Sequence, residues 1–207
     1  GTGGDEIFGG YNRHYKRLRD SIAGSLSLLP LKLIKIISKI FGTKISHYII
    51  IAWDKGLAFG SDTSGVHLGL MRKIIQNSQN YDKAIKLTKN QFSSINDLEM
   101  QWGFSYSRMI MDIQNYLVDN ILSITDKTSM ASSIEARVPL LDHRLVELAF
   151  SVSEKINISS NFNNAKNSLK DSIGALLPSQ ILSRPKIGFN APVDYWINSE
   201  NTKLKKR

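Results

Sequence analysis

A helical repeat of apolar residues in the middle of the chain constrains its fold most. From Ile95 onward, apolar side chains recur every three or four residues, at Leu98, Trp102, Tyr106, Met109, Ile113 and Leu117. This spacing places them on one face of a helix. An aromatic stripe of this kind packs into a protein core far more often than it binds a cofactor. The sequence therefore predicts one buried stripe that begins at Ile95.

Shorter helices are predicted on both sides of this stripe. They cover residues 30–42, 81–92, 127–133, 145–150, 165–177 and 193–197. Asp126 and Asp142 are good N-caps for the third and fourth of these helices, and Pro178 ends the fifth. The wide apolar arc of residues 30–42 favours a helix packed on the protein over one lying on a membrane surface. No run of residues indicates alternating strands, so the chain is predicted to be mainly α.

The composition excludes several kinds of site. The 207 residues contain no cysteine, which excludes disulfides, thiolate zinc sites and a cysteine nucleophile. The four histidines lie too far apart in the sequence to indicate a metal site. No stretch approaches the roughly 18 apolar residues of a membrane span. The net charge of +9, from 27 Lys and Arg against 18 Asp and Glu, indicates either an anionic partner or a solvated basic surface.

The chain opens with a glycine-rich loop that contains two acids. Residues 1–11 read Gly-Thr-Gly-Gly-Asp-Glu-Ile-Phe-Gly-Gly-Tyr. Glycines allow backbone N–H groups to turn toward an anion, and the start of a helix adds partial positive charge. Asp5 and Glu6 are predicted in the first helical turn, where they either share a Mg²⁺ with phosphate oxygens or complement the helix dipole. Such a loop normally follows a strand, so we expect a fragment of a longer protein.

Two further charged motifs lie in the second half of the chain. In residues 126–142 charges alternate with small residues, and Glu135 is predicted to pair with Arg137 or Lys127. Residues 184–189 read Arg-Pro-Lys-Ile-Gly-Phe, which places Lys186 in a stiff loop. A lysine held in this way can meet a phosphate as a point charge, or it can remain a solvated loop cation.

Together, the three motifs resemble those of the glutamine-dependent asparagine synthetases. Residues 1–11 are similar to the glycine-acid loop of that family. Residues 133–147, Ser-Ile-Glu-Ala-Arg-Val-Pro-Leu-Leu-Asp-His-Arg-Leu-Val-Glu, are similar to its central signature. Residues 184–196, Arg-Pro-Lys-Ile-Gly-Phe-Asn-Ala-Pro-Val-Asp-Tyr-Trp, are similar to its C-terminal signature. The order and spacing match as well, and the resemblance extends to about residue 200.

The resemblance implies that residues 1–207 are the C-terminal, mostly helical part of an α/β synthetase domain of the adenine-nucleotide-α-hydrolase type. Few or no strands are expected in this part. The glutaminase domain and the upstream Ser-Gly-Gly-x-Asp-Ser loop would be missing, so the chain alone is expected to be inactive.

The chemistry that the resemblance implies is the conversion of aspartate to asparagine. ATP and Mg²⁺ activate the side-chain carboxylate as an acyl-adenylate, and ammonia from glutamine then displaces AMP. The resemblance also implies a cytoplasmic enzyme, a possible homodimer, and neither nucleic acid nor membrane as a partner.

The matching motifs assign candidate ATP-binding residues. Asp5 would bind the Mg²⁺–pyrophosphate. Gly1 and Gly3 would contact ATP. Lys186 would stabilise charge on the pyrophosphate and the α-phosphoryl group, which is where negative charge develops during adenylation.

The central signature and Thr2 are assigned to the amine step. The resemblance places Glu135 near amine attack, where it acts either directly or by orienting neighbouring Lys or Arg side chains. Lys127 and Arg137 are weaker candidates, for cofactor binding. Many family members carry an acid at the position of Thr2, where it could help to deprotonate the incoming amine; threonine cannot serve as that base at neutral pH. The substrate could therefore differ, as in related enzymes that form amides on a sugar or a peptide.

An alternative from another class is a basic helical module that binds nucleic acid or an anionic membrane surface. Such a module needs its cations clustered on one face with aromatic residues between them. Here the informative cations lie in two distant motifs that also contain Asp, Glu and Gly, which favours a phosphate and metal site.

Overall fold

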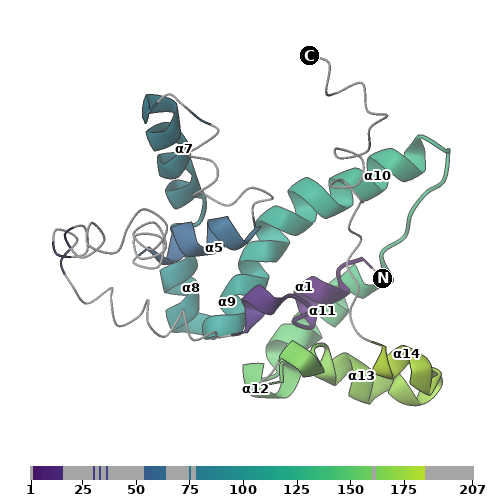
Figure 1. Ribbon diagram of the computed structural model, residues 1–207. Coiled ribbons are helices and arrows are strands. Elements are labelled where there is room, and N and C mark those ends of the chain that lie inside the picture. Colours follow the sequence, from purple (N-terminus) through teal and green to yellow (C-terminus); the bar gives the residue numbers. More distant parts are fainter. Residues whose placement is uncertain are drawn as a thin grey trace, which may run out of the picture. The chain divides into compact units, whose positions relative to one another are not determined.

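The computed structural model describes residues 2–15, 30, 33, 36, 54–63, 75, 78–159 and 162–184 (Figure 1). Every regular element within these ranges is a helix, which confirms the prediction of a mainly α chain for the residues described. The chain divides into two compact units, Gly1–Asp171 and Ser172–Arg207. Among the described helices, none is both long enough and apolar enough to cross a lipid bilayer.

Most helices of the first unit are short. The described elements of this unit are α1 (Gly4–Ile7), η1 (Asn12–His14), α5 (Lys55–Thr63), α7 (Ser78–Gln91), α8 (Ile95–Trp102), α9 (Phe104–Met111), η2 (Asp112–Leu122), α10 (Ser123–Met130), η3 (Pro139–Leu141), α11 (His143–Ser151), α12 (Glu154–Asn157) and η4 (Phe162–Asn164). α13 (Asn167–Ile173) crosses the boundary between the units. The second unit contains η5 (Gly174–Leu176) and α14 (Ser179–Ser183) among its described residues.

One long helix runs from α9 through η2 into α10. The backbone keeps right-handed helical angles at both junctions, Asp112 and Ser123, and Figure 1 shows the three elements following one another without a break. The middle element, η2, is π-helical over its whole length. π-helical turns inside an α-helix are rare and are frequently found at functional sites.

The predicted apolar stripe is divided between two helices. Gly103, with φ of 86°, ends α8 and precedes α9, and this left-handed angle is one that glycine adopts without strain. Tyr106, Met109 and Leu117 are buried as predicted, but the side chain of Trp102 is 39% exposed. The prediction of a single buried stripe is therefore wrong at Trp102, because the break at Gly103 resets the phase of the helical repeat.

The long helix contributes residues to the core of the first unit. Three buried clusters are Tyr15, Tyr106, Met109 and Ile158; Phe59, Phe92, Ile95 and Met111; and Ile7, Phe8 and Ala149. The first two clusters include residues of α9. The Tyr106 hydroxyl, buried in the first cluster, donates a hydrogen bond to the Ala149 carbonyl at 2.8 Å. Segments from both ends of this unit therefore pack on α9.

The other predicted helices are confirmed in part. α7 includes residues 81–91, almost the whole of the segment predicted there. Asp142 caps α11 as predicted, because its carboxylate accepts a hydrogen bond from the Arg144 backbone N–H at 3.0 Å. The prediction that Asp126 is an N-cap is wrong: the chain is already helical before α10, so Asp126 lies inside a continuous helix.

Two predicted helices differ at their ends. α10 ends at Met130, short of the predicted residue 133. α13 begins at Asn167 and continues into η5, whereas the sequence predicted a start at residue 165; Lys166 has φ of 60° and cannot belong to a right-handed helix. Within the predicted helix 30–42, the described residues Leu33 and Ile36 are helical and exposed. The predicted helix 193–197 lies outside the described residues.

Candidate functional site

Residues 3–10 form a tight loop around the single helical turn of α1. The Ile7 backbone N–H donates to the Gly3 carbonyl at 3.1 Å, and that of Gly10 donates to the Asp5 carbonyl at 2.7 Å. Ile7 is fully buried and anchors the loop in the core. Asp5 lies in this turn as predicted, but a four-residue helix has little of the macrodipole that an acid in a first turn would complement.

The side chain of Asp5 occupies space that Gly10 leaves open. A Cβ atom at position 10 would overlap Oδ1 of Asp5. Any other residue there would displace the carboxylate or the backbone. The Asp5 side chain remains 27% exposed, so the loop presents one oriented and accessible carboxylate.

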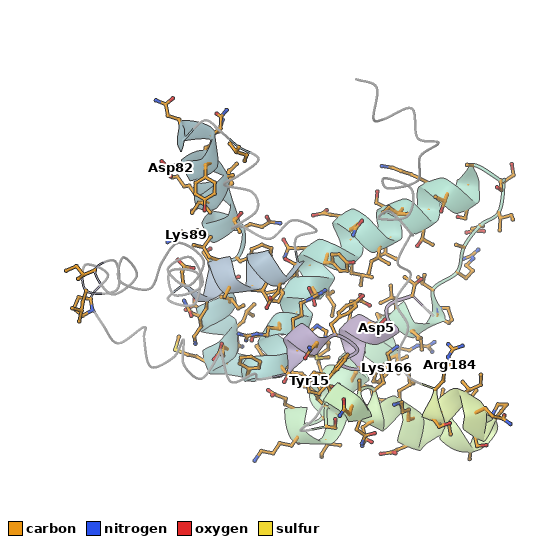
Figure 2. All side chains as sticks on the ribbon, in the orientation of Figure 1. Asp5, Tyr15, Asp82, Lys89, Lys166 and Arg184 are labelled. Carbon is orange, nitrogen blue, oxygen red and sulfur yellow. The ribbon has the colours of Figure 1, made fainter. Side chains whose placement is uncertain are left out.

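Lys166, which is far from Asp5 in the sequence, forms an ion pair with this carboxylate. Its Nζ atom lies 2.8 Å from Oδ1 of Asp5, and Figure 2 shows the two side chains together. Lys166 directly precedes α13, where its backbone adopts the left-handed φ of 60°. The sequence pattern did not indicate Lys166, because position 166 falls within the predicted helix 165–177. The only local signal is the turn-forming pair Asn163 and Asn164 just before it.

The neighbouring acid, Glu6, faces the interior. Its side chain is buried, and Oε1 accepts a hydrogen bond from the Tyr11 hydroxyl at 2.6 Å. Burial raises the pKa of Glu6 above its ordinary value. Burial, together with the hydrogen bond to Glu6, likewise raises the pKa of Tyr11. Of the two acids in the loop, Asp5 is therefore the one that a ligand can reach.

The central signature begins on an exposed segment after α10. Oε2 of Glu135 and Nη2 of Arg137 lie 2.9 Å apart, which confirms the predicted ion pair, and the side chains are 68% and 81% exposed. Lys127 is exposed on α10 and makes no ion pair within the described part of the chain. Exposed pairs contribute only about 0–1 kcal/mol to stability. These three side chains are thus not needed to hold the described fold and are accessible to a ligand.

The glycine-acid loop and the central signature meet at their small and apolar residues. A Cβ atom on Gly3 would overlap the side chain of Leu141, and one on Gly4 would lie 2.8 Å from Cδ1 of Leu140. In the residues described, no hydrogen bond or ion pair joins Glu135 to Asp5. The two motifs therefore share a packing contact, while their charged groups stay separate.

The remaining candidate residues are placed only in part. Thr2 is partly buried in the turn that leads into α1. Gly1 and Lys186 lie outside the described residues, as does the C-terminal motif beyond Arg184. The roles assigned to them stay predictions.

The accessible donors fit Mg²⁺ as a substrate-bridging ion. The described residues contain no group of three or more His, Asp or Glu side chains that could hold a metal. Mg²⁺ does not require such a group, because it keeps several waters and is usually bound by one or two carboxylates plus substrate phosphates. Asp5 can supply one such carboxylate, and the Lys166 ammonium beside it can meet phosphate oxygens.

Comparison with known proteins identifies what the chain is similar to. The sequence model of the family described as Asparagine synthase matches residues 1–205. The chain is 26% identical over 219 residues to asparagine synthetase (glutamine-hydrolyzing) 1 of Bacillus subtilis, an alignment that covers 97% of this chain and 31% of that protein. A putative asparagine synthetase (glutamine-hydrolyzing) of Mycobacterium tuberculosis is 32% identical over 89 residues, 43% of this chain and 13% of that protein.

Asparagine synthetase (glutamine-hydrolyzing) 3 of Bacillus subtilis is 35% identical over 71 residues, 34% of this chain and 11% of that protein. No solved structure matches the chain. The chain thus spans at most about a third of the length of these curated relatives.

Proposed function

Because the chain belongs to the asparagine synthase family, we propose that it forms part of an enzyme that makes amides at the expense of ATP. For the complete protein we propose the conversion of aspartate to asparagine with ammonia derived from glutamine. An oxygen of the aspartate side-chain carboxylate attacks the α-phosphorus of ATP, and the bond to pyrophosphate breaks. The ammonia nitrogen then bonds to the carbonyl carbon, AMP leaves with the bonding electrons, and the nitrogen loses a proton.

The observation that carries this proposal is the pair formed by Asp5 and Lys166. It combines the accessible carboxylate of the glycine-acid loop with the Lys166 ammonium group at 2.8 Å, and both residues lie within the family match. A metal-bound polyphosphate would offer both charges a partner, because Asp5 would bind the metal and Lys166 would bind phosphate oxygens. Mg²⁺, when bound, neutralises charge on the phosphates. We propose that Asp5 orients this complex and that Lys166 binds its oxygens while keeping Asp5 in place.

Further residues complete the proposed site. Lys186 is proposed to stabilise charge on the α-phosphoryl group, and Gly1 and Gly3 to contact ATP through their backbone. Glu135, exposed on the central signature, is proposed to act at the amine step, and Lys127 and Arg137 are proposed to contribute to cofactor binding. The proposed domain context is an α/β synthetase domain of the adenine-nucleotide-α-hydrolase type, joined to a glutaminase part in a cytoplasmic enzyme.

A second candidate substrate class follows from Thr2. A hydroxyl replaces the acid that many family members carry at this position, so a group that could help to deprotonate the amine is absent here. We therefore keep an amide synthetase acting on a sugar or a peptide carboxylate as the alternative. A basic binding module is no longer proposed, because the family match covers nearly the whole chain.

Isotope exchange between ATP and pyrophosphate in the complete protein tests the role of Asp5. The change Asp5→Asn removes the charge but preserves the shape, and we expect exchange to fall by about 10²-fold or more, a loss of about 2.7 kcal/mol. Asp97→Asn is a matched control, because Asp97 also lies in the first turn of a helix and is exposed. Equal exchange in the two variants across a Mg²⁺ titration would show that Asp5 has only a structural role.

A further inference from the structure

A buried group of polar and charged side chains joins the end of the glycine-acid loop to the π-helical element. Asp112, the first residue of η2, accepts a hydrogen bond on Oδ2 from Nε of Arg13 at 2.7 Å. Nε2 of His14 lies 2.6 Å from the same oxygen. The side chains of His14 and Asp112 are fully buried, and that of Arg13 is nearly so. We call these three residues the Asp112 node.

The Asp112 node is only partly satisfied. Nη2 of Arg13, Nδ1 of His14 and Oδ1 of Asp112 are all buried without a hydrogen-bond partner among the described residues. Buried charges and unpaired polar atoms cost stability that a well-packed apolar cluster would not. The node is therefore a poor way to stabilise a core. What it does provide is a fixed direction for the Arg13 guanidinium, because two groups converge on one carboxylate oxygen.

The fixed Arg13 guanidinium in turn contacts residues that support the glycine-acid loop. The Arg13 guanidinium lies over the Tyr11 ring, 4.1 Å from its centre, and 4.9 Å from the centre of the Tyr116 ring of η2. The hydroxyl of Tyr11 in turn donates to Glu6 in α1 at 2.6 Å. A continuous series of contacts thus leads from Asp112 through Arg13 and Tyr11 to the residue next to Asp5.

α1 needs this support because it is a single turn in a glycine-rich loop. Its apolar anchor, Ile7, packs toward α11, whereas Tyr11 and Arg13 attach the loop to η2. We propose that Asp112 is a positioning residue, which fixes the glycine-acid loop on η2 and so places the Asp5 carboxylate for its polyphosphate ligand. The proposal rests on the proposed function of Asp5. Asp112 itself is buried and does not touch the ligand.

Two measurements on the complete protein test this role without turnover. The first is amide hydrogen exchange of residues 3–10 in the ligand-free protein, and the second is calorimetric binding of Mg²⁺–pyrophosphate. Asp112→Asn should speed exchange in the loop by about tenfold or more and weaken binding by about 10- to 100-fold, the range for residues that support a metal ligand. Leu57→Val is the control, because Leu57 is buried in a cluster that contains no residue of the Asp112 node, and this change should alter neither measurement.

Tyr11→Phe provides a milder test if Asp112→Asn fails to fold. It removes the hydroxyl that contacts Glu6 and should move both measurements in the same direction by a smaller factor. Loop exchange and affinity equal to those of Leu57→Val in both variants would overturn the proposal. Asp5→Asn, titrated in parallel, separates the two ideas: normal Mg²⁺–pyrophosphate binding by that variant would refute the ligand role of Asp5, while loop exchange would still report on Asp112.

Discussion

Lys166 reaches Asp5 from a backbone conformation that a lysine rarely adopts. The two side chains meet at 2.8 Å, while φ of Lys166 is 60°. The left-handed conformation costs a non-glycine residue about 1–2 kcal/mol, whereas a partly exposed ion pair returns only about 0–1 kcal/mol. The ion pair does not offset the strain, and strained residues of this kind cluster at functional sites. This strain supports the ligand-binding role that we propose for Lys166.

Replacing Lys166 by glycine or by alanine separates strain from charge. Both changes remove the ammonium group, so both should reduce ATP–pyrophosphate exchange by about 10- to 100-fold. Only glycine relieves the left-handed strain, and Lys166→Gly should therefore be more stable than Lys166→Ala by about 1 kcal/mol. Urea unfolding and the exchange assay check the two effects. The control is Lys155→Ala, because Lys155 lies at an exposed position on α12. If Lys166→Ala is as active as this control, Lys166 does not belong to the site.

Lys186→Ala in the complete protein should cut turnover by about 10²- to 10³-fold, or about 2.7–4 kcal/mol, as for the loss of one preorganised donor. ATP binding should change less, because the lysine is expected to meet charge that develops in the transition state. Stability should move by no more than about 0.5 kcal/mol. Steady-state kinetics and a melting curve check this. Lys186→Arg should restore little activity, because the planar guanidinium group of arginine does not replace the compact ammonium group of lysine. A lowered melting temperature with normal turnover would count against a role for Lys186 in the site.

Glu135→Gln should separate the two chemical steps. The pair with Arg137 is exposed, so we expect a stability change of less than about 1 kcal/mol. If Glu135 acts at the amine step, ATP–pyrophosphate exchange should persist while amide formation from ammonia falls by about 10²-fold. Measuring both rates in one preparation is the test, with the exposed Glu147→Gln of α11 as the control. Equal loss of both rates would place Glu135 at adenylation instead.

His14 should make the protein less stable in mild acid. Burial lowers the pKa of His14 below its ordinary value of 6.5, and Arg13 acts in the same direction against the nearby Asp112 carboxylate. On acidification the unfolded chain therefore takes up the proton first, and the free energy of unfolding falls as the pH drops from about 6.5 toward the folded-state pKa. Above that window His14 is neutral in both states and has no effect.

Urea unfolding from pH 5 to pH 8 checks this effect when wild type is compared with His14→Gln. When the free energy of unfolding is plotted against pH, the variant should lack the part of the slope that His14 contributes. Glu6 has a raised pKa and favours folding at the acidic end, losing that contribution as the pH rises above about 4.5. This opposite contribution is common to both proteins and cancels in the comparison. Identical slopes below pH 6.5 would contradict the assignment.

Much of the local structure followed from the sequence because it depends on neighbouring residues. The helical repeat before and within α9 predicted the buried Tyr106 and Met109, and Asp142 was recognised as a cap from its position before a helix. The three motifs also indicated the family that the comparison then confirmed. Asp126 was misread because a capping residue type says nothing about whether the preceding residues are already helical.

The tertiary structure alone decided which distant residues meet. The sequence identified Asp5 as a candidate, but it contains no local signal that Lys166 will reach its carboxylate, or that Asp112 will hold Arg13 and His14. Residue types alone did not distinguish Asp5 from Glu6; the family resemblance assigned the metal to Asp5, and the tertiary structure buries Glu6 while it leaves Asp5 accessible. Helix periodicity and capping depend on residues that are close together in the sequence, so the local sequence predicts them. Ion pairs and burial depend on how segments pack, and that packing is set by the whole chain.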